Sequence, residues 1–128
     1  IMFASDTYRT ELCDDRQTFD VYHRDKLIFN QLDLPLRGYY QQQNLPGVLM
    51  TIDVLRGEGW RITREQVEHG LVNVVQQTKL KGRWQKLQSK PLIVCDTGHN
   101  VEGIAVLLKQ IKAQSYRHLH MVWGVVRD

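Results

Sequence analysis

The chain has only two cysteines and no long apolar run. Cys13 and Cys95 stand far apart and match no metal-ligand spacing, so we expect two reduced thiols rather than a disulfide or a zinc site. No apolar stretch approaches the length of a membrane span, and no basic-then-apolar leader opens the sequence. These absences predict a cytoplasmic protein without a membrane partner.

The sequence also lacks a cluster of charges of one sign. The formal net charge is +3, and the positive residues are dispersed among acids instead of forming a basic stripe. Proteins that follow a phosphate backbone need such a stripe. The sequence therefore argues against a nucleic-acid partner.

The size and composition are those of a folded domain, since the chain has 128 residues, of which 42% are hydrophobic and 24% are charged. Both ends are apolar, with "IMFA" at the start and "MVWGVVRD" at the end, whereas natural termini are usually polar. We therefore interpret the sequence as a piece of a longer protein.

The N-terminal third of the chain predicts a β-hairpin. Residues 17–34 give two extended runs around "RDK", and their apolar side chains recur at even spacings. These side chains are Phe19, Val21, Ile28 and Leu32 or Leu34.

A helix is predicted from Asn44, which can cap it, with Pro46 suited to its first turn and "GEG" at 57–59 as its end. A second helix opens at Thr63, which has capping-box spacing to Gln66. The apolar residues of the two helices recur at helical spacing, and the second pattern fades by Thr78. They are Leu45, Val48, Leu49, Ile52 and Leu55, then Val67, Leu71, Val74 and Val75.

The apolar period is lost between residues 79 and 91, which is typical of a linker with room for one short strand. Beyond it, "LIVC" at 92–95 predicts a buried strand, Ile104 to Ile111 a helix, and "HLHMVWGVV" a second strand in parallel pairing. We expect an α/β chain divided into residues 1–82, a linker at 83–90, and residues 91–128.

The stretch "DTGHN" lies at the turn from strand to helix, where ligands collect in parallel α/β units. Asp96 can accept hydrogen bonds from sugar hydroxyls, Gly98 permits close backbone approach, and His99 can donate to an anion or transfer a proton near neutral pH. The same stretch also suits a simple helix start, because Asn100 is a good N-cap. Alone it does not decide between a site and a cap.

Two other stretches contain candidate binding residues. Arg83, beside a glycine in "LKGRWQ", can present its guanidinium to a phosphate, although a solvated linker is the simpler explanation. Gln41 and Asn44 offer amide groups that suit a purine edge, although capping explains them as well.

Together, "LPLRGYYQQQN", "LKGRWQ" and "PLIVCDTGHNVEG", in this order and at these separations, resemble folylpolyglutamate synthase and its bifunctional form, dihydrofolate synthase, in the Mur ligase superfamily. The Gly-Arg pair and Asp-x-x-His-Asn are the most specific part of the resemblance. It implies the end of a central ATPase domain, built of a β-hairpin and helices, followed by the start of a Rossmann-like C-terminal domain. In that family the nucleotide binds where these domains meet.

The resemblance also implies a role for each candidate. Asn44, with Gln41 nearby, contacts adenine, Arg83 reaches the phosphates, and Asp96 holds the ribose. His99 works beside the reacting phosphate and the incoming glutamate.

The implied reaction is ATP-driven amide formation, in which a folate or dihydropteroate carboxylate becomes an acyl phosphate and L-glutamate displaces the phosphate. Mg²⁺ is an implied cofactor, with ligands largely outside this chain, and the sequence contains no G-x-x-x-x-G-K-[ST] phosphate loop. We expect the full-length protein to be a monomer and the isolated chain to be inactive.

Three residues depart from the family pattern: Tyr40 stands where histidine is common, Thr97 where glycine is frequent, and Val101 where proline is frequent. Two alternatives to a folate ligase stay open. One is a Mur-type cell-wall amino-acid ligase, and the other is a non-catalytic nucleotide-binding or interaction module.

Overall fold

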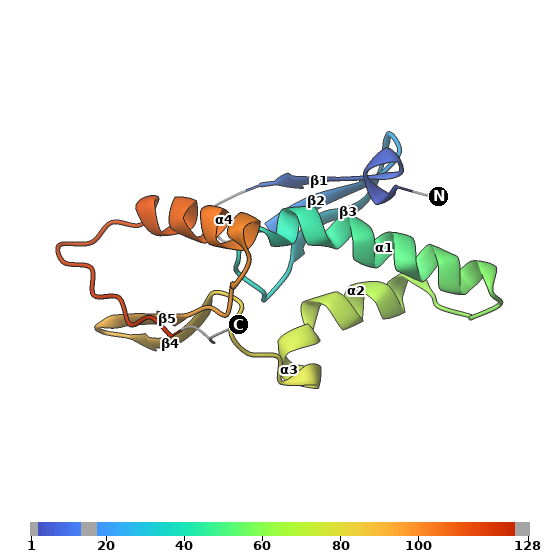
Figure 1. Cartoon of the computed structure of the whole chain (residues 1–128). Helices are drawn as coiled ribbons and strands as arrows, with labels where there is room; N and C mark the ends of the chain where they lie inside the picture. The colour runs from blue at the N-terminus through green and yellow to red at the C-terminus, as the bar shows by residue number, and fades with distance from the viewer. Residues whose placement is uncertain (1–2, 14–17, 125–128) are drawn as a thin grey trace.

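A computed structural model of the chain describes residues 3–13 and 18–124, and it shows a mixed α/β fold with two separate antiparallel sheets (Figure 1). The strands are β1 (Tyr8–Leu12), β2 (Thr18–His23) and β3 (Lys26–Asp33) in one sheet, and β4 (Gln85–Ser89) and β5 (Leu92–Cys95) in the other. A short 3-10 helix, η1 (Ala4–Asp6), precedes β1. The helices are α1 (Gln41–Gly57), α2 (Arg64–Val72), α3 (Val74–Thr78) and α4 (Val101–Lys112).

The predicted hairpin is confirmed as β2 and β3, which pair in antiparallel register through a turn at Arg24 and Asp25. The inward face of β3 differs from the prediction, because Phe29 is buried in place of Ile28. An irregularity in the pairing changes the alternation of β3: Gln31 takes a positive φ of 49°, and its N–H donates to Asp20 Oδ1 at 2.7 Å. Phe29 and Leu32 therefore both face the core.

The first helix begins four residues earlier than predicted, at Gln41 instead of at Leu45 after an Asn44 cap. Asn44 does not cap this helix, since its Nδ2 donates to Gln41 Oε1 at 3.1 Å. Pro46 therefore lies in the second turn, where its missing N–H leaves the carbonyl of Gln42 without its helical partner.

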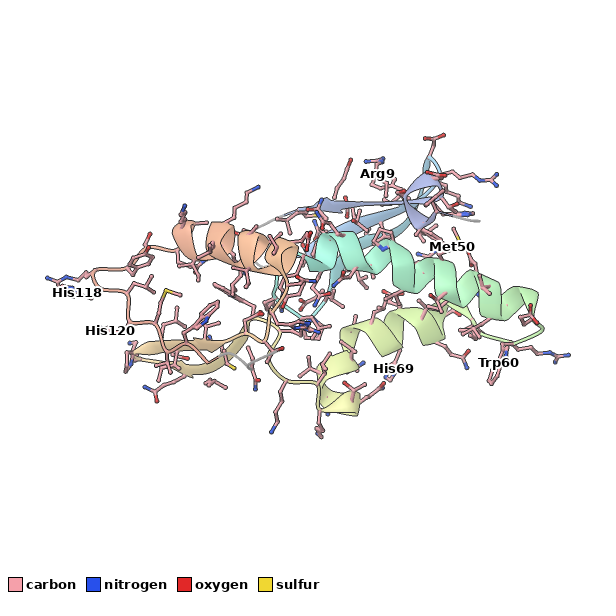
Figure 2. The ribbon with its side chains drawn as sticks, in the orientation of Figure 1. Arg9, Met50, Trp60, His69, His118 and His120 are labelled. Carbon is pink, nitrogen blue, oxygen red and sulfur yellow. The ribbon has the colours of Figure 1, made fainter. Side chains whose placement is uncertain are left out.

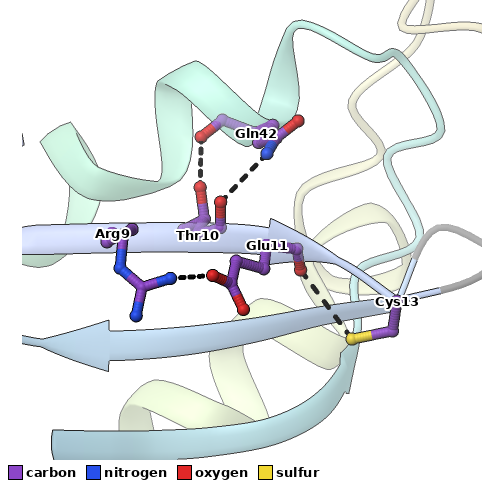
Figure 3. A network of polar contacts seen from close by, with 5 residues as sticks. All are labelled: Arg9, Thr10, Glu11, Cys13 and Gln42. Atoms are coloured by element: carbon purple, nitrogen blue, oxygen red, sulfur yellow. Dashed lines mark hydrogen bonds and ion pairs between the residues drawn. The ribbon is translucent and has the colours of Figure 1, made fainter. Parts of the chain in front are cut away.

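A contact from the sheet satisfies that carbonyl. The hydroxyl of Thr10 in β1 donates to Gln42 O at 2.6 Å, and Gln42 Nε2 donates back to Thr10 O at 2.9 Å (Figure 3). Thr10 is buried, so this reciprocal pair fixes the start of α1 against β1. A tertiary contact thus allows a helix start that local capping did not predict.

The second helix opens as predicted, with both hydrogen bonds of the capping box between Thr63 and Gln66 present. It ends at Val72, and a separate short helix, α3, follows from Val74, so the predicted single helix is two. Helix α1 lies against the three-stranded sheet with α2 beside it (Figure 1). Trp60 is exposed on the loop that joins the two helices (Figure 2). The core of these elements comprises Tyr8, Phe19, Val21, Phe29, Leu32, Leu34, Leu45, Leu49, Val67 and Leu71.

The C-terminal part corrects two predictions. Strand β5 pairs antiparallel with β4, its neighbour across the tight turn at Lys90 and Pro91, and not in a parallel unit. Its residues are not buried, since Leu92 is 56% exposed and Ile93 43%. Residues 118–124 form no strand, and the last two residues of that predicted strand lie outside the described residues.

Helix α4 forms as predicted, with Asn100 as its N-cap accepting from Gly103 N at 2.7 Å. A glutamine attaches it to the rest of the fold. Gln110 is fully buried, its Oε1 accepts from Tyr39 N at 2.9 Å, and its Nε2 donates to Arg37 O at 2.7 Å. These two bonds join α4 to the loop that leads into α1. Within the described ranges, no helix is long and apolar enough to cross a membrane.

The Thr10 and Gln42 pair predicts a measurable loss of stability. Thr10→Val removes the hydroxyl donor and leaves the part-buried carbonyl of Gln42 without this bond, so the free energy of unfolding should fall by about 1 kcal/mol. Thr51→Val is the matched control, because its hydroxyl donates to Gly47 O on the exposed side of the same helix, and it should change stability by less than about 0.5 kcal/mol. Urea denaturation measures both. Equal losses would contradict the role given to Thr10.

Candidate functional site

The carboxylate of Asp96, directly after β5, accepts three hydrogen bonds from two other parts of the chain and its own turn. Oδ2 accepts from the Tyr40 hydroxyl at 2.8 Å and from the backbone N–H of Trp84 at 2.6 Å. Oδ1 accepts from Gly98 N at 2.8 Å. The start of α1, the residues before β4, and the β5–α4 turn therefore meet at this one side chain.

The Gly82 and Arg83 stretch is held by a second set of contacts. Gly82 O accepts from both the backbone N and the Oγ1 of Thr97, each at 3.0 Å. Gly82 is buried with a φ of +70°, and a Cβ there would lie 2.4 Å from Thr97 Cγ2. Only glycine fits this position, so the glycine before Arg83 is explained by backbone geometry.

The Tyr40 hydroxyl is the donor in its bond to Asp96. Burial first, and then the hydrogen bond and charge of Asp96, raise the pKa of Tyr40 above its ordinary value of 10.0. The guanidinium of Arg83 acts in the opposite direction and lowers the pKa of Tyr40 by a smaller effect. The hydroxyl therefore stays protonated at neutral pH, and Tyr40, Arg83 and Asp96 lie within interaction range of one another.

Gln41 and Asn44 are brought together by their own hydrogen bond at 3.1 Å. Gln41 follows Tyr40 directly and is buried, whereas Asn44 is exposed. Asn44 therefore has an accessible side chain next to a fixed neighbour, which suits a ligand contact as well as it suits solvent.

His99 is exposed at the start of α4, and its Nδ1 lies 3.2 Å from Thr97 O. A carbonyl only accepts, so Nδ1 carries the proton in this contact and Nε2 of the neutral ring keeps its lone pair. The ring is thus oriented by backbone, with the nitrogen that can accept a proton directed away from that bond. Asn100, the next residue, caps the helix, so the turn contains a cap and an accessible histidine together.

An open cleft of about 1160 Å³ lies beside this cluster. Arg83, Trp84 and Lys86 line one part of it, and Arg37 and Tyr39 another. Arg37 pairs with Asp33 at 2.7 Å. Of the five candidate residues only Arg83 is among the residues that line the cleft, so it is the candidate that connects the cleft with Asp96.

The described part of the chain contains no group of three His, Cys, Asp or Glu side chains placed to hold a metal ion. Asp96, the carboxylate in the cluster, is engaged by three protein donors. These residues do not fit a Mg²⁺ site, and no catalytic step is assigned to a metal held by this chain.

No family model matches the chain. A curated relative, folylpolyglutamate synthase from Lacticaseibacillus casei, is 29% identical over 100 residues, which are 77% of this chain and 22% of that protein. A probable bifunctional folylpolyglutamate synthase/dihydropteroate synthase from Haloferax volcanii is 27% identical over 95 residues, 74% of this chain and 10% of that protein.

Solved structures match as well. An FPGS-AMPPCP-folate complex matches with a TM-score of 0.65 and 30% identity, over 84% of this chain and 27% of that chain. The apo form of L. casei FPGS has a TM-score of 0.61, with the same identity and coverage. The chain is similar to folylpolyglutamate synthases. This confirms the resemblance drawn from the three motifs, and the chain spans less than a third of the length of each of these proteins.

The sequence missed two contributors to the site. The motif comparison identifies Tyr40 only as a departure from histidine, although it lies directly before the candidate residue Gln41. Gln110 could have been found from the sequence, because a glutamine three residues after Leu107 interrupts the apolar face of a helix and so indicates a polar group in a buried position. Neither residue's partner is close in sequence, so the contacts could not be predicted from local pattern.

The close contact at Gly82 predicts that alanine is destabilising there but not at Gly70. Gly82→Ala forces a Cβ against Thr97 at a positive φ and should lower the free energy of unfolding by about 2 kcal/mol. Gly70→Ala in α2 is the control: a Cβ there meets nothing within 4 Å, and alanine should keep or raise stability by up to about 1 kcal/mol. Thermal and urea unfolding measure both. A Gly82→Ala chain as stable as the original would refute the close approach.

Proposed function

We propose that this chain is part of an ATP-dependent ligase that adds L-glutamate to dihydropteroate or to folylpolyglutamate through an acyl-phosphate intermediate. The observation that carries the proposal is the convergence of Tyr40, Arg83 and Asp96 from three separate stretches of the sequence. The likeness to the FPGS-AMPPCP-folate complex supports the proposal, since that complex contains an ATP analogue, AMPPCP, and a folate.

Arg83 is the proposed phosphate contact. Its guanidinium lies beside an open cleft that Lys86 also lines, so an anionic ligand there meets two cationic side chains. An arginine can pair with two phosphate oxygens at once and stabilise charge that develops during phosphoryl transfer. Arg83 would thus help form the acyl phosphate.

Asp96, Asn44 and Gln41 are the proposed nucleoside contacts. Oδ1 of Asp96 accepts the Gly98 N–H, and a carboxylate oxygen has room for a second donor such as a ribose hydroxyl. The exposed amide of Asn44, paired with Gln41, supplies a donor and an acceptor for the adenine edge.

His99 is the proposed residue for the glutamate step. The side chain is exposed, and the lone pair of its Nε2 can accept a proton. Removing a proton from the glutamate amine makes that amine the nucleophile that displaces phosphate from the acyl phosphate. Orientation of the ring by the Thr97 carbonyl supports this role.

The remaining features of the proposed enzyme follow from the same family relationship. Residues 1–82 belong to a central ATP-binding domain, 83–90 to a linker that includes all of β4, and 91–128 to the start of a C-terminal domain. The enzyme acts in the cytoplasm as a monomer, with Mg²⁺ held by residues outside this chain. Its substrates are ATP, L-glutamate and a folate or dihydropteroate.

The test is glutamate-dependent ADP release by the full-length protein that contains this chain. ATP should be consumed with L-glutamate plus dihydropteroate or tetrahydrofolate, and not with muramyl substrates. Consumption with muramyl substrates would favour a cell-wall ligase instead. No consumption with any acceptor would favour a non-catalytic module. The isolated chain should release no ADP.

Three variants connect that activity to the site. Arg83→Ala should lower kcat/KM for ATP by about 100-fold, and Arg83→Lys should restore little, because lysine lacks the two-point geometry. His99→Ala should lower kcat by about 100-fold. The control is His118→Ala, since His118 lies on the exposed loop after α4 (Figure 2) and should keep wild-type kinetics. Equal kinetics for His99→Ala and His118→Ala would exclude a catalytic role for His99.

A further inference from the structure

Tyr40 connects two parts of the chain that are 56 residues apart. Its hydroxyl donates to Asp96 Oδ2 at 2.8 Å, the same oxygen that accepts the N–H of Trp84 at 2.6 Å. The Tyr40 ring packs over Gly38, where a Cβ would lie 2.2 Å from the ring carbon Cζ. The ring is therefore held closely from one side, and its hydroxyl points to the carboxylate.

The turn at Arg83 and Trp84 needs an outside contact to keep its shape. Trp84 has a φ of 48°, a left-handed conformation that is strained for a residue with a side chain. Its N–H is bound by Asp96, and the preceding glycine carbonyl is bound by Thr97. Asp96 thus stabilises the backbone that presents Arg83 to the cleft.

We propose that Tyr40 is a positioning residue of the nucleotide site, which acts by orienting the Asp96 carboxylate and, through it, the turn that carries Arg83. The kinetic part of this inference rests on the proposed ligase function. A phenylalanine at 40 keeps the ring and removes the donor, so Asp96 loses one of the two bonds that fix Oδ2. Histidine at 40 supplies a ring N–H on a shorter side chain and should replace the donor in part.

The experiment compares Tyr40→Phe, Tyr40→His and Tyr116→Phe in the full-length protein. Tyr40→Phe should lower kcat/KM for ATP by about tenfold and leave the KM for glutamate unchanged, because only the nucleotide contacts are displaced. Tyr40→His should recover part of that loss. Tyr116→Phe is the control, since Tyr116 is half exposed on the loop after α4 and should behave as wild type.

Hydrogen–deuterium exchange of the peptide that contains residues 82–86 supplies a readout that does not need activity. Tyr40→Phe should speed exchange in this peptide more than Tyr40→His does, and Tyr116→Phe should not change it. A wild-type protein without glutamate-dependent ADP release would overturn the ligase function, and faster exchange in Tyr40→Phe would still support positioning. Unchanged exchange and unchanged kcat/KM for ATP, even with a lower melting temperature, would overturn the proposal.

Discussion

The Asp96 carboxylate is the contact on which the arrangement of the candidate site depends. It accepts hydrogen bonds from the start of α1, from the residues before β4, and from its own turn. Bonds to a charged acceptor are stronger than neutral ones and costly to leave unmade. One side chain therefore sets the relative positions of the Tyr40, Arg83 and Gly98 stretches, which are far apart in sequence.

The rest of the C-terminal part supports that contact. Gln110, fully buried, joins α4 to the loop before α1, and Thr97 binds the carbonyl of Gly82 twice. Both attachments use polar groups whose loss would leave buried donors or acceptors unpaired. The apolar core, by contrast, lies almost wholly in the three-stranded sheet, α1 and α2. Polar contacts, more than apolar packing, hold the site region to the core.

The sequence predicted the features that depend on neighbouring residues. The capping box at Thr63, the cap at Asn100 and the β2–β3 hairpin are local, and each is present. Two features were wrong for different reasons. The start of α1 depends on a distant partner, Thr10, whereas β5 pairs with its sequence neighbour β4, whose residues lack the apolar alternation that would have marked a strand. For the candidate site, motif order named residues whose roles stay predictions. It did not show that both oxygens of Asp96 accept protein N–H and O–H groups, nor that Tyr40 is one of the donors.

A double-mutant cycle tests most directly whether Tyr40 and Asp96 act as one unit in the nucleotide site. Tyr40→Phe, Asp96→Ala and the double variant are compared by kcat/KM for ATP in the full-length protein. We predict that the double variant is no worse than Asp96→Ala alone, because removing the acceptor abolishes the effect of removing its donor. Losses that multiply independently in the double variant would contradict a shared role for the two residues.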